Sequence, residues 1–251
     1  MQVGLIGAGN IARALARGWG EPVLVSDSGS GRARELASEL GGEALDSRAV
    51  AERADLVVLC HKPAQLATVA EQIRDRVKAV ASVLGGVPIA ALQEAYPGVP
   101  AFRLMPNTPV EVRRGVICYA PTPGIDPAVE QDVLALFERL GSVVRLPEAT
   151  FEAATAVSGV GPAYLALLAE AQIDAAVRHG LPAGIADKIT VETMEGTAAL
   201  LAYRGYDTHA VRREVTSPGG STARGLAALE RAGVRAAFQD AMDAVAGWSQ
   251  G

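Results

Sequence analysis

The fold is decided by the stretch Gly4-Leu5-Ile6-Gly7-Ala8-Gly9-Asn10-Ile11-Ala12, close to the start of the chain. It fits the pattern G-x-G-x-x-G/A, in which the first glycine makes a tight turn and the second admits a pyrophosphate. A predicted strand precedes the pattern and a predicted helix follows it, which favours a dinucleotide site over an accidental turn. The predicted contacts of this turn are Gly7, Ala8, Gly9, Asn10, Ile11 and Ala12.

Short apolar runs alternate with amphipathic stretches through the first half of the chain. Strands are predicted at 3–6, 22–26, 55–60, 79–84 and 101–104, with helices near 10–18, 31–40, 63–76 and 88–95. Two later strands, 116–119 and 142–146, flank a helix at 127–140. This alternation predicts a parallel sheet with right-handed crossovers.

The pattern changes after Pro147. Alanine-rich helical segments are predicted at 150–157, 162–179, 182–203, 207–214, 221–231 and 234–248. We therefore predict an α/β chain with a Rossmann-type domain at 1–147 and an all-helical domain at 148–251. Several of these helices are apolar on more than one face, and a domain of about a hundred residues has little interior to bury them. This favours a helical dimer interface, and a compact alanine-rich bundle is the alternative.

Composition excludes several classes of function. The 251 residues are 49% hydrophobic and 20% charged, which is typical of a globular protein. The net charge of −5 and the lack of a basic stripe argue against a nucleic-acid or anionic-membrane partner. We expect no membrane-spanning stretch, because no apolar run is both long and free of charge. A strand begins within two residues of Met1, so we expect no signal peptide.

The cysteines and histidines do not indicate a metal site. Cys60 and Cys118 lie in apolar, strand-like runs without ligand spacing, which predicts structural thiols in a reducing compartment, the cytoplasm. The three histidines are scattered, and no two of them have ligand spacing on one helix face.

The end of the second predicted strand bears on the choice of cofactor. Asp27 lies about 20 residues after Gly7, where an acid accepts hydrogen bonds from a ribose 2′-hydroxyl and repels a 2′-phosphate. That favours NADH. Ser28, Ser30 and Arg32 follow at once and are able to hold a 2′-phosphate, or to form a solvated turn. The choice between NADPH and NADH stays open.

Two further loops follow predicted strands and therefore face the ligand edge of the sheet. One contains Cys60, His61, Lys62 and Pro63, and the other is 83–86. Lys62 is a candidate catalytic acid or phosphate contact, but we favour a role of this tetrapeptide through its backbone geometry. His61 is interpreted as a partly exposed loop residue.

The run 215–226, V-T-S-P-G-G-S-T-A-R-G-L, opens the helix predicted at 221–231. The first backbone N–H groups of a helix lack intrahelical partners, and the macrodipole adds partial positive charge there. Hydroxyl groups and adjacent glycines complete a site suited to a carboxylate or a phosphate. A capped helix after a tight turn is the alternative.

Two other motifs complete a family pattern. R-L-M-P-N-T-P at 103–109 follows the fifth predicted strand, and S-G-V-G-P-A-Y at 158–164 opens a long helix. With the glycine-rich turn and the 215–226 run, in this order, they resemble pyrroline-5-carboxylate reductase over essentially the whole chain. The resemblance implies a Rossmann domain and a helical domain that interlocks with a second subunit, as a homodimer or larger oligomer. It also implies NADPH as cofactor, and active sites between the nucleotide domain and helices of the dimer.

The resemblance also implies roles for single residues. The predicted cofactor contacts it adds are Cys60, His61, Lys62, Pro63, Gly85, Met105 and Asn107, beside Asp27 and Ser28. The predicted substrate contacts are Ser217, Gly220, Ser221 and Thr222, with Glu148 where the family has an acidic residue near the substrate. Thr222 is the candidate catalytic residue, through a hydrogen bond from its hydroxyl to the ring nitrogen of 1-pyrroline-5-carboxylate.

Departures from the family pattern leave other readings open. Asp27-Ser28-Gly29 stands where the family often has Asn-Arg-Ser/Thr. The family's usual residues are also replaced at Leu84, Val160 and 204–208, which are expected near the pocket wall. A reductase of another cyclic imine is therefore one alternative. A β-hydroxyacid dehydrogenase is disfavoured, because Lys188 lacks the surroundings of that family's catalytic lysine. A non-catalytic nucleotide-binding regulator is disfavoured by the intact 217–222 run.

Overall fold

The computed structural model describes residues 1–248, so the last three residues of the predicted helical domain lie outside the described residues. The chain divides into two compact units, Met1–Pro162 and Ala163–Gly251. The sequence predicts that a helical dimerisation domain begins at residue 148, and this boundary stays a prediction.

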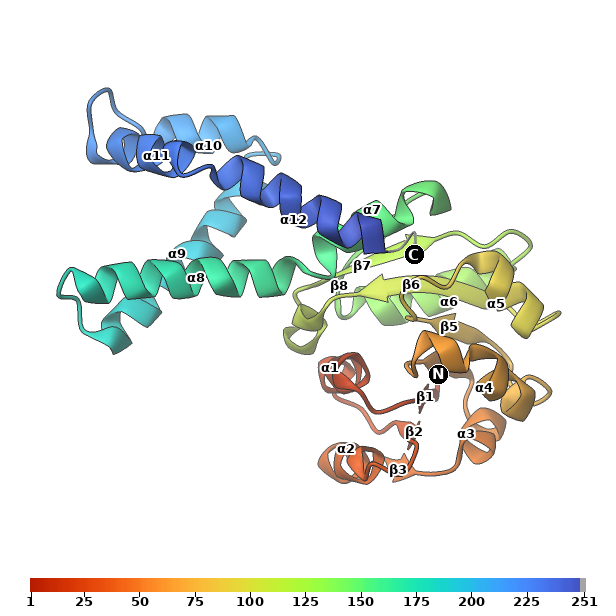
Figure 1. Ribbon diagram of the computed structural model, residues 1–251. Coiled ribbons are helices and arrows are strands. Elements are labelled where there is room, and N and C mark those ends of the chain that lie inside the picture. The colour runs from red at the N-terminus through yellow and green to blue at the C-terminus, as the bar shows by residue number, and fades with distance from the viewer. Residues whose placement is uncertain (249–251) are drawn as a thin grey trace. The chain divides into compact units, whose positions relative to one another are not determined.

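The first unit contains an eight-stranded sheet of order β3-β2-β1-β4-β5-β6-β7-β8 (Figure 1). Its strands are β1 (Val3–Ile6), β2 (Leu24–Ser26), β3 (Glu43–Ala44), β4 (Leu56–Leu59), β5 (Val80–Ser82), β6 (Ala101–Pro106), β7 (Gly115–Ala120) and β8 (Gly141–Arg145). The pairs are parallel except β6 with β7, which is antiparallel. Strand order reverses between β1 and β4, and ligands bind such sheets beyond the carboxyl ends at this switch point.

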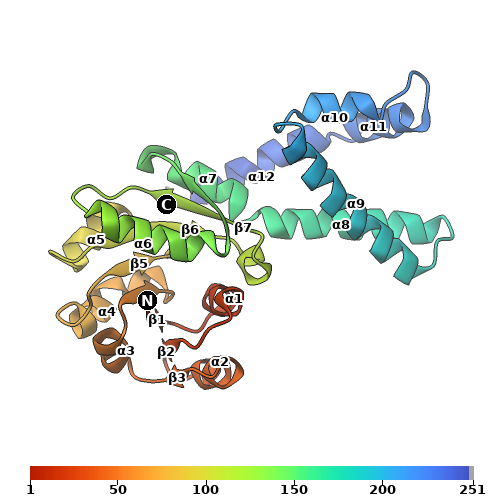
Figure 2. The ribbon, with the colours of Figure 1, turned by 180° about the vertical axis from the view of Figure 1, so that it is seen from behind.

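Helices cover both faces of the sheet (Figures 1 and 2). One buried cluster holds residues of α1 (Asn10–Trp19), α2 (Arg32–Leu40) and α6 (Pro127–Glu138). A second holds residues of α3 (Ser47–Arg53), α4 (Leu66–Ile73) and α5 (Ile89–Ala95). Val57 belongs to the second cluster and Val58 to the first, and neighbouring side chains of a strand point to opposite faces. The two clusters therefore form the two sides of a three-layer domain.

A smaller cluster joins the segment after the sheet to the first unit. It contains Ile89, Cys118, Ala120 and Phe151, which are all buried. Phe151 begins α7 (Phe151–Ser158), directly after the 3₁₀ turn η3 (Glu148–Thr150). Residues 148–158 thus pack as part of the sheet unit.

Three stretches of the chain differ from the predicted elements. The stretch 43–53 was left without structure and forms β3 and α3, although Asp46 marks the start of α3 by accepting a hydrogen bond from the Ala49 amide at 2.9 Å. The helix predicted at 63–76 is a 3₁₀ turn, η1 (Pro63–Gln65), followed by α4. A further 3₁₀ turn, η2 (Thr108–Val112), follows β6.

The second unit is helical, as predicted. Its elements are α8 (Gly161–Arg178, whose first two residues belong to the first unit), α9 (Ala183–Tyr203), α10 (Thr208–Glu214), α11 (Ser221–Arg231) and α12 (Val234–Trp248). Tyr164 and Phe238 meet edge to face with their ring centroids 6.3 Å apart. Large apolar side chains remain exposed, among them Leu167 at 63%. One chain alone therefore leaves much apolar helix surface uncovered.

One stretch corrects the sequence analysis. Within the described residues, Glu148–Arg178 contains an 18-residue window that meets the criterion for a membrane-crossing helix by length and composition only, with a mean hydropathy of 1.3 and 11% of that window buried. The expectation that no such stretch exists was therefore wrong. The stretch is not one helix, because a turn at 159–160 separates α7 from α8.

Candidate active site

A cavity of ≈ 590 Å³ lies at the carboxyl ends of β1, β2 and β4. Its lining comes from the segments 6–9, 26–32 and 60–72 together with Ser47. It contains eight of the predicted cofactor contacts: Gly7, Ala8, Gly9, Asp27, Ser28, Cys60, His61 and Lys62. Ser30 and Arg32 lie in the same wall. The cavity therefore lies at the switch point, where the motif analysis expects the nucleotide.

Glycine is suited to positions 7 and 9 of the first turn for two different structural reasons. Gly7 has φ +110°, and a Cβ there would lie 2.6 Å from the Cys60 carbonyl oxygen. Gly9 has ordinary extended backbone, and a Cβ there would meet nothing within 4 Å. Gly9 is the N-cap of α1 and no side chain caps this helix. Uncapped N–H groups beside open space are the arrangement that a pyrophosphate needs, so these residues fit a dinucleotide.

Asp27 is held by its own loop. Its Oδ1 accepts a hydrogen bond from the Gly29 amide at 2.9 Å, and its Oδ2 accepts from the Ser30 hydroxyl at 2.7 Å and the Ala33 amide at 3.0 Å. The Ser30 hydrogen bond, followed by those from the backbone, lowers the pKa of Asp27. The carboxylate is therefore ionised at neutral pH. Its contribution to stability is lost only as the pH falls through that lowered pKa.

The 60–63 loop is built from backbone contacts and the His61 imidazole, and His61 is partly exposed, as predicted. The Lys62 carbonyl lies 2.9 Å from His61 Nδ1, so we assign the imidazole proton to Nδ1. Burial lowers the pKa of His61, which keeps the ring neutral at pH 7. Burial also raises the pKa of the Cys60 thiol to about 12, so this cysteine is no nucleophile. Lys62 contributes its amide and carbonyl to a turn with Gln65.

The ends of β5 and β6 bring two more predicted residues together. A Cβ on Gly85 would lie 4.0 Å from Met105 Cε, so these residues are neighbours. Both polar atoms of the Asn107 side chain make hydrogen bonds within the protein. Oδ1 accepts from the Val116 amide at 2.8 Å, and Nδ2 donates to the Ser158 carbonyl at 3.1 Å. Its side chain thus joins the end of β6 to the S-G-V-G-P motif.

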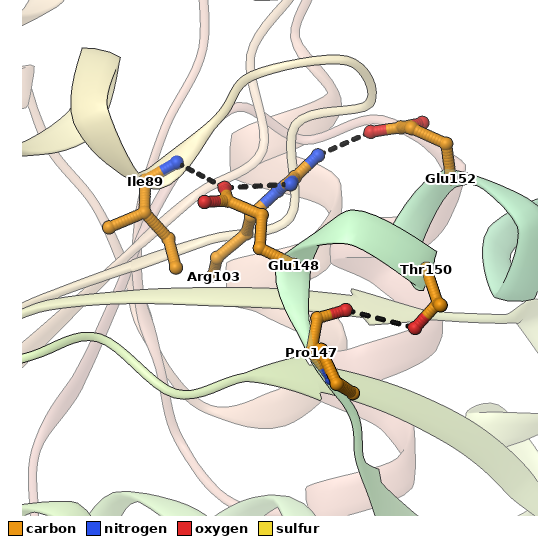
Figure 3. A network of polar contacts seen from close by, with 6 residues as sticks. All are labelled: Ile89, Arg103, Pro147, Glu148, Thr150 and Glu152. Carbon is orange, nitrogen blue, oxygen red and sulfur yellow. Dashed lines mark hydrogen bonds and ion pairs between the residues drawn. The ribbon is translucent and has the colours of Figure 1, made fainter.

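Sequence reasoning gave no role to Arg103, although it is a charged residue inside an apolar strand. Its side chain is only 4% exposed, and its guanidinium contacts Glu148 at 2.9 Å and also Glu152 (Figure 3). Glu148 Oε1 additionally accepts the Ile89 amide at 2.7 Å. Glu148, predicted to lie near the substrate, is therefore engaged by the protein itself through this oxygen.

In the second unit, the predicted anion site is the start of α11. Gly220 is its N-cap, and no side chain caps the helix. The Gly220 amide donates to the Ser217 carbonyl at 3.1 Å, and Gly219 has φ +69°. The tight turn is thus present, and the first N–H groups of α11 have no side-chain acceptor. Ser221 and Thr222 begin the helix.

Within residues 1–248, no group of three His, Cys, Asp or Glu side chains is arranged to hold a metal ion. The residues gathered at the two sites are instead glycines, hydroxyls, backbone amides and the charged side chains of Asp27, Arg32 and Lys62. The chemistry they support is the binding and orientation of organic ligands.

A glycine turn at the start of α1, with an acid after β2, defines a dinucleotide-binding domain of the Rossmann type. In agreement, residues 2–86 match the family described as NADP oxidoreductase, coenzyme F420-dependent. Residues 148–250 match the family of pyrroline-5-carboxylate reductase dimerisation domains. The chain belongs to the pyrroline-5-carboxylate reductase family.

Individual relatives cover nearly the whole chain. A pyrroline-5-carboxylate reductase from Corynebacterium melassecola is 34% identical, over 99% of this chain and 97% of the relative. One from Synechocystis sp. is also 34% identical, over 97% and 95%. The crystal structure of Plasmodium falciparum pyrroline carboxylate reductase with NADP bound has a TM-score of 0.88 and 26% identity, over 99% of this chain and 97% of that one.

Proposed function

We propose that this chain reduces 1-pyrroline-5-carboxylate to L-proline with NADPH or NADH, as the last step of proline biosynthesis in the cytoplasm. The observation that carries the proposal is the uncapped start of α11, behind the Ser217–Gly220 turn. It offers amide and hydroxyl donors to one carboxylate. The cofactor cavity at the switch point and the full-length similarity to reductases of this name support it.

The mechanism needs orientation more than acid–base chemistry. The bound cofactor supplies a hydride for the carbon of the C5=N bond, and the imine nitrogen carries a proton when the hydride arrives. In our proposal, amides at 220–222 hold the substrate carboxylate, and Thr222 Oγ makes the hydrogen bond to the ring nitrogen. A protonated imine is already a good electrophile, so no histidine or carboxylate is required as general acid.

Asp27 is proposed to favour NADH over NADPH, because its charge repels a 2′-phosphate. We expect Asp27→Asn to raise the NADPH-to-NADH ratio of kcat/KM about tenfold, the effect of about 1.4 kcal/mol. Asp46→Asn is the matched control, because the Asp46 carboxylate also accepts a hydrogen bond from a backbone amide near the start of a helix and does not line the cofactor cavity. If the NADPH-to-NADH ratio of kcat/KM in Asp27→Asn stays within about twofold of the wild-type ratio, the carboxylate stabilises its own loop and does not select the cofactor.

The helical unit is proposed to form a homodimer or larger homo-oligomer. Apolar side chains such as Leu167 and Val191 are more than half exposed in one chain, and burial against a second copy removes them from water. Sedimentation equilibrium at micromolar protein is expected to give a mass of at least twice 25.9 kDa. A stable, active species of 25.9 kDa would refute the oligomer.

A further inference from the structure

We propose that Arg103 is a positioning residue for the hydride transfer, acting through Glu148 and the Ile89 amide. These three groups, which we name the Arg103 brace, hold the loop after β5 against the end of β6. The inference rests on the proposed function, because its purpose is to fix the two segments that the family resemblance places beside the nicotinamide.

The brace is a continuous chain of short contacts (Figure 3). Arg103 Nη1 donates to Glu148 Oε1 at 2.9 Å, and the same oxygen accepts the Ile89 amide at 2.7 Å. Ile89 is the first residue of α5, and Glu148 lies in η3. One carboxylate oxygen therefore ties β6, α5 and η3 together.

Arg103 is fixed more firmly than a surface arginine. Its guanidinium lies 4.1 Å from the centroid of the buried Phe151 ring, and its second terminal nitrogen contacts Glu152. Glu148 and Glu152 are 39% and 42% exposed, so the cation is the buried member of the group. A buried cation needs carboxylate partners, and of the two partners only Glu148 also accepts the Ile89 amide.

The brace connects to the reaction through two neighbouring loops. Arg103 and Met105 lie two residues apart on β6, so their side chains share one face of the sheet. The chain from Gly85 leads within four residues to the braced Ile89 amide. Gly85 and Met105 themselves lie side by side, as the 4.0 Å separation above indicates. Release of the Ile89 amide would loosen the Gly85 loop against Met105.

This role differs from the one implied by the family resemblance. A substrate contact would need Glu148 to turn its charge towards the substrate, yet the oxygen that defines its position is shared by Arg103 and Ile89. The two roles predict different kinetics. Loss of a substrate contact raises KM for the imine, whereas misplacement of the nicotinamide lowers kcat.

Glu148→Gln is the test and Glu152→Gln the matched control. Glutamine keeps the size of Glu148, removes the charge that pairs with Arg103, and offers the Ile89 amide only a neutral, weaker acceptor. Both glutamates are partly exposed, so both variants are expected to fold. We expect kcat to fall about tenfold in Glu148→Gln, with KM for 1-pyrroline-5-carboxylate within about twofold. The primary isotope effect on kcat with 4-deuterated cofactor should rise. Glu152→Gln removes a carboxylate from the same guanidinium but leaves the Ile89 hydrogen bond in place, so kcat should stay within about twofold of the wild type.

Hydrogen exchange of the ligand-free protein supplies a readout that does not depend on turnover. The amides of 84–92 are expected to exchange about fivefold faster in Glu148→Gln than in the wild type or Glu152→Gln. Equal exchange in the three proteins overturns the brace, as does an unchanged kcat or a rise confined to the imine KM. Absence of wild-type turnover would instead contradict the proposed function, and the exchange result would still decide on the brace.

Discussion

Thr222→Val is expected to lower kcat/KM for 1-pyrroline-5-carboxylate about 100-fold, a loss of about 2.7 kcal/mol of transition-state stabilisation. Valine has the shape of threonine and lacks the hydroxyl that we assign to the ring nitrogen. Thr222 is the second residue of α11, and Gly220 rather than Thr222 is the N-cap. The substitution should therefore leave the free energy of unfolding nearly unchanged. Steady-state kinetics and thermal melting measure the two effects.

Two controls sharpen the result. Thr222→Ser keeps the hydroxyl and is expected to retain kcat/KM within about fivefold. Thr208→Val makes the same chemical change at the start of α10 and should have no effect on the rate. A value for Thr222→Val within about threefold of the wild type would mean that this hydroxyl does not contact the reacting bond.

Gly7→Ala is expected to abolish cofactor binding and to destabilise the protein by about 2 kcal/mol. The new Cβ would lie 2.6 Å from the Cys60 carbonyl oxygen and 2.9 Å from the His61 amide nitrogen, and φ is +110°. Both contacts are to backbone atoms, which cannot move without displacing the loop that lines the cavity. Chemical denaturation and cofactor fluorescence titration measure the two effects.

Gly9→Ala separates binding from folding. Its backbone suits alanine and its Cβ would meet nothing within 4 Å, so the melting temperature should stay within about 2 °C of the wild type. The Kd for the cofactor is expected to rise about 30-fold, because the methyl group occupies the space of the pyrophosphate. Unchanged cofactor affinity in Gly9→Ala would place the nucleotide elsewhere.

The sequence predicts the part of the fold that local patterns specify. The turn at Gly7 and Gly9 is recognisable because a strand and a helix flank it, and the shift to helical period after Pro147 marks the α-helical region. β3 was not predicted, because Glu43–Ala44 consists of only two exposed residues and is too short to show an alternating apolar pattern. α3 was within reach, since Asp46 is a recognisable N-cap.

The candidate site likewise contains residues that the sequence predicts and contacts that it does not. The cavity residues after β1, β2 and β4 were predictable because topology brings the carboxyl ends of parallel strands together. The partners of Arg103 and Asn107 were not, because the contacts to Glu148 and Ser158 span 45 and 51 residues of sequence. The engagement of Asp27 by Gly29, Ser30 and Ala33 is local, but several loop conformations are compatible with that sequence.

The central claim is tested most directly by steady-state oxidation of NADPH and, separately, of NADH with 1-pyrroline-5-carboxylate at neutral pH. We expect rapid turnover with at least one cofactor and formation of one proline for each cofactor oxidised. The ratio of the two kcat/KM values reports the effect of Asp27. Protein that binds the cofactor and oxidises neither form in the presence of this imine would contradict the account.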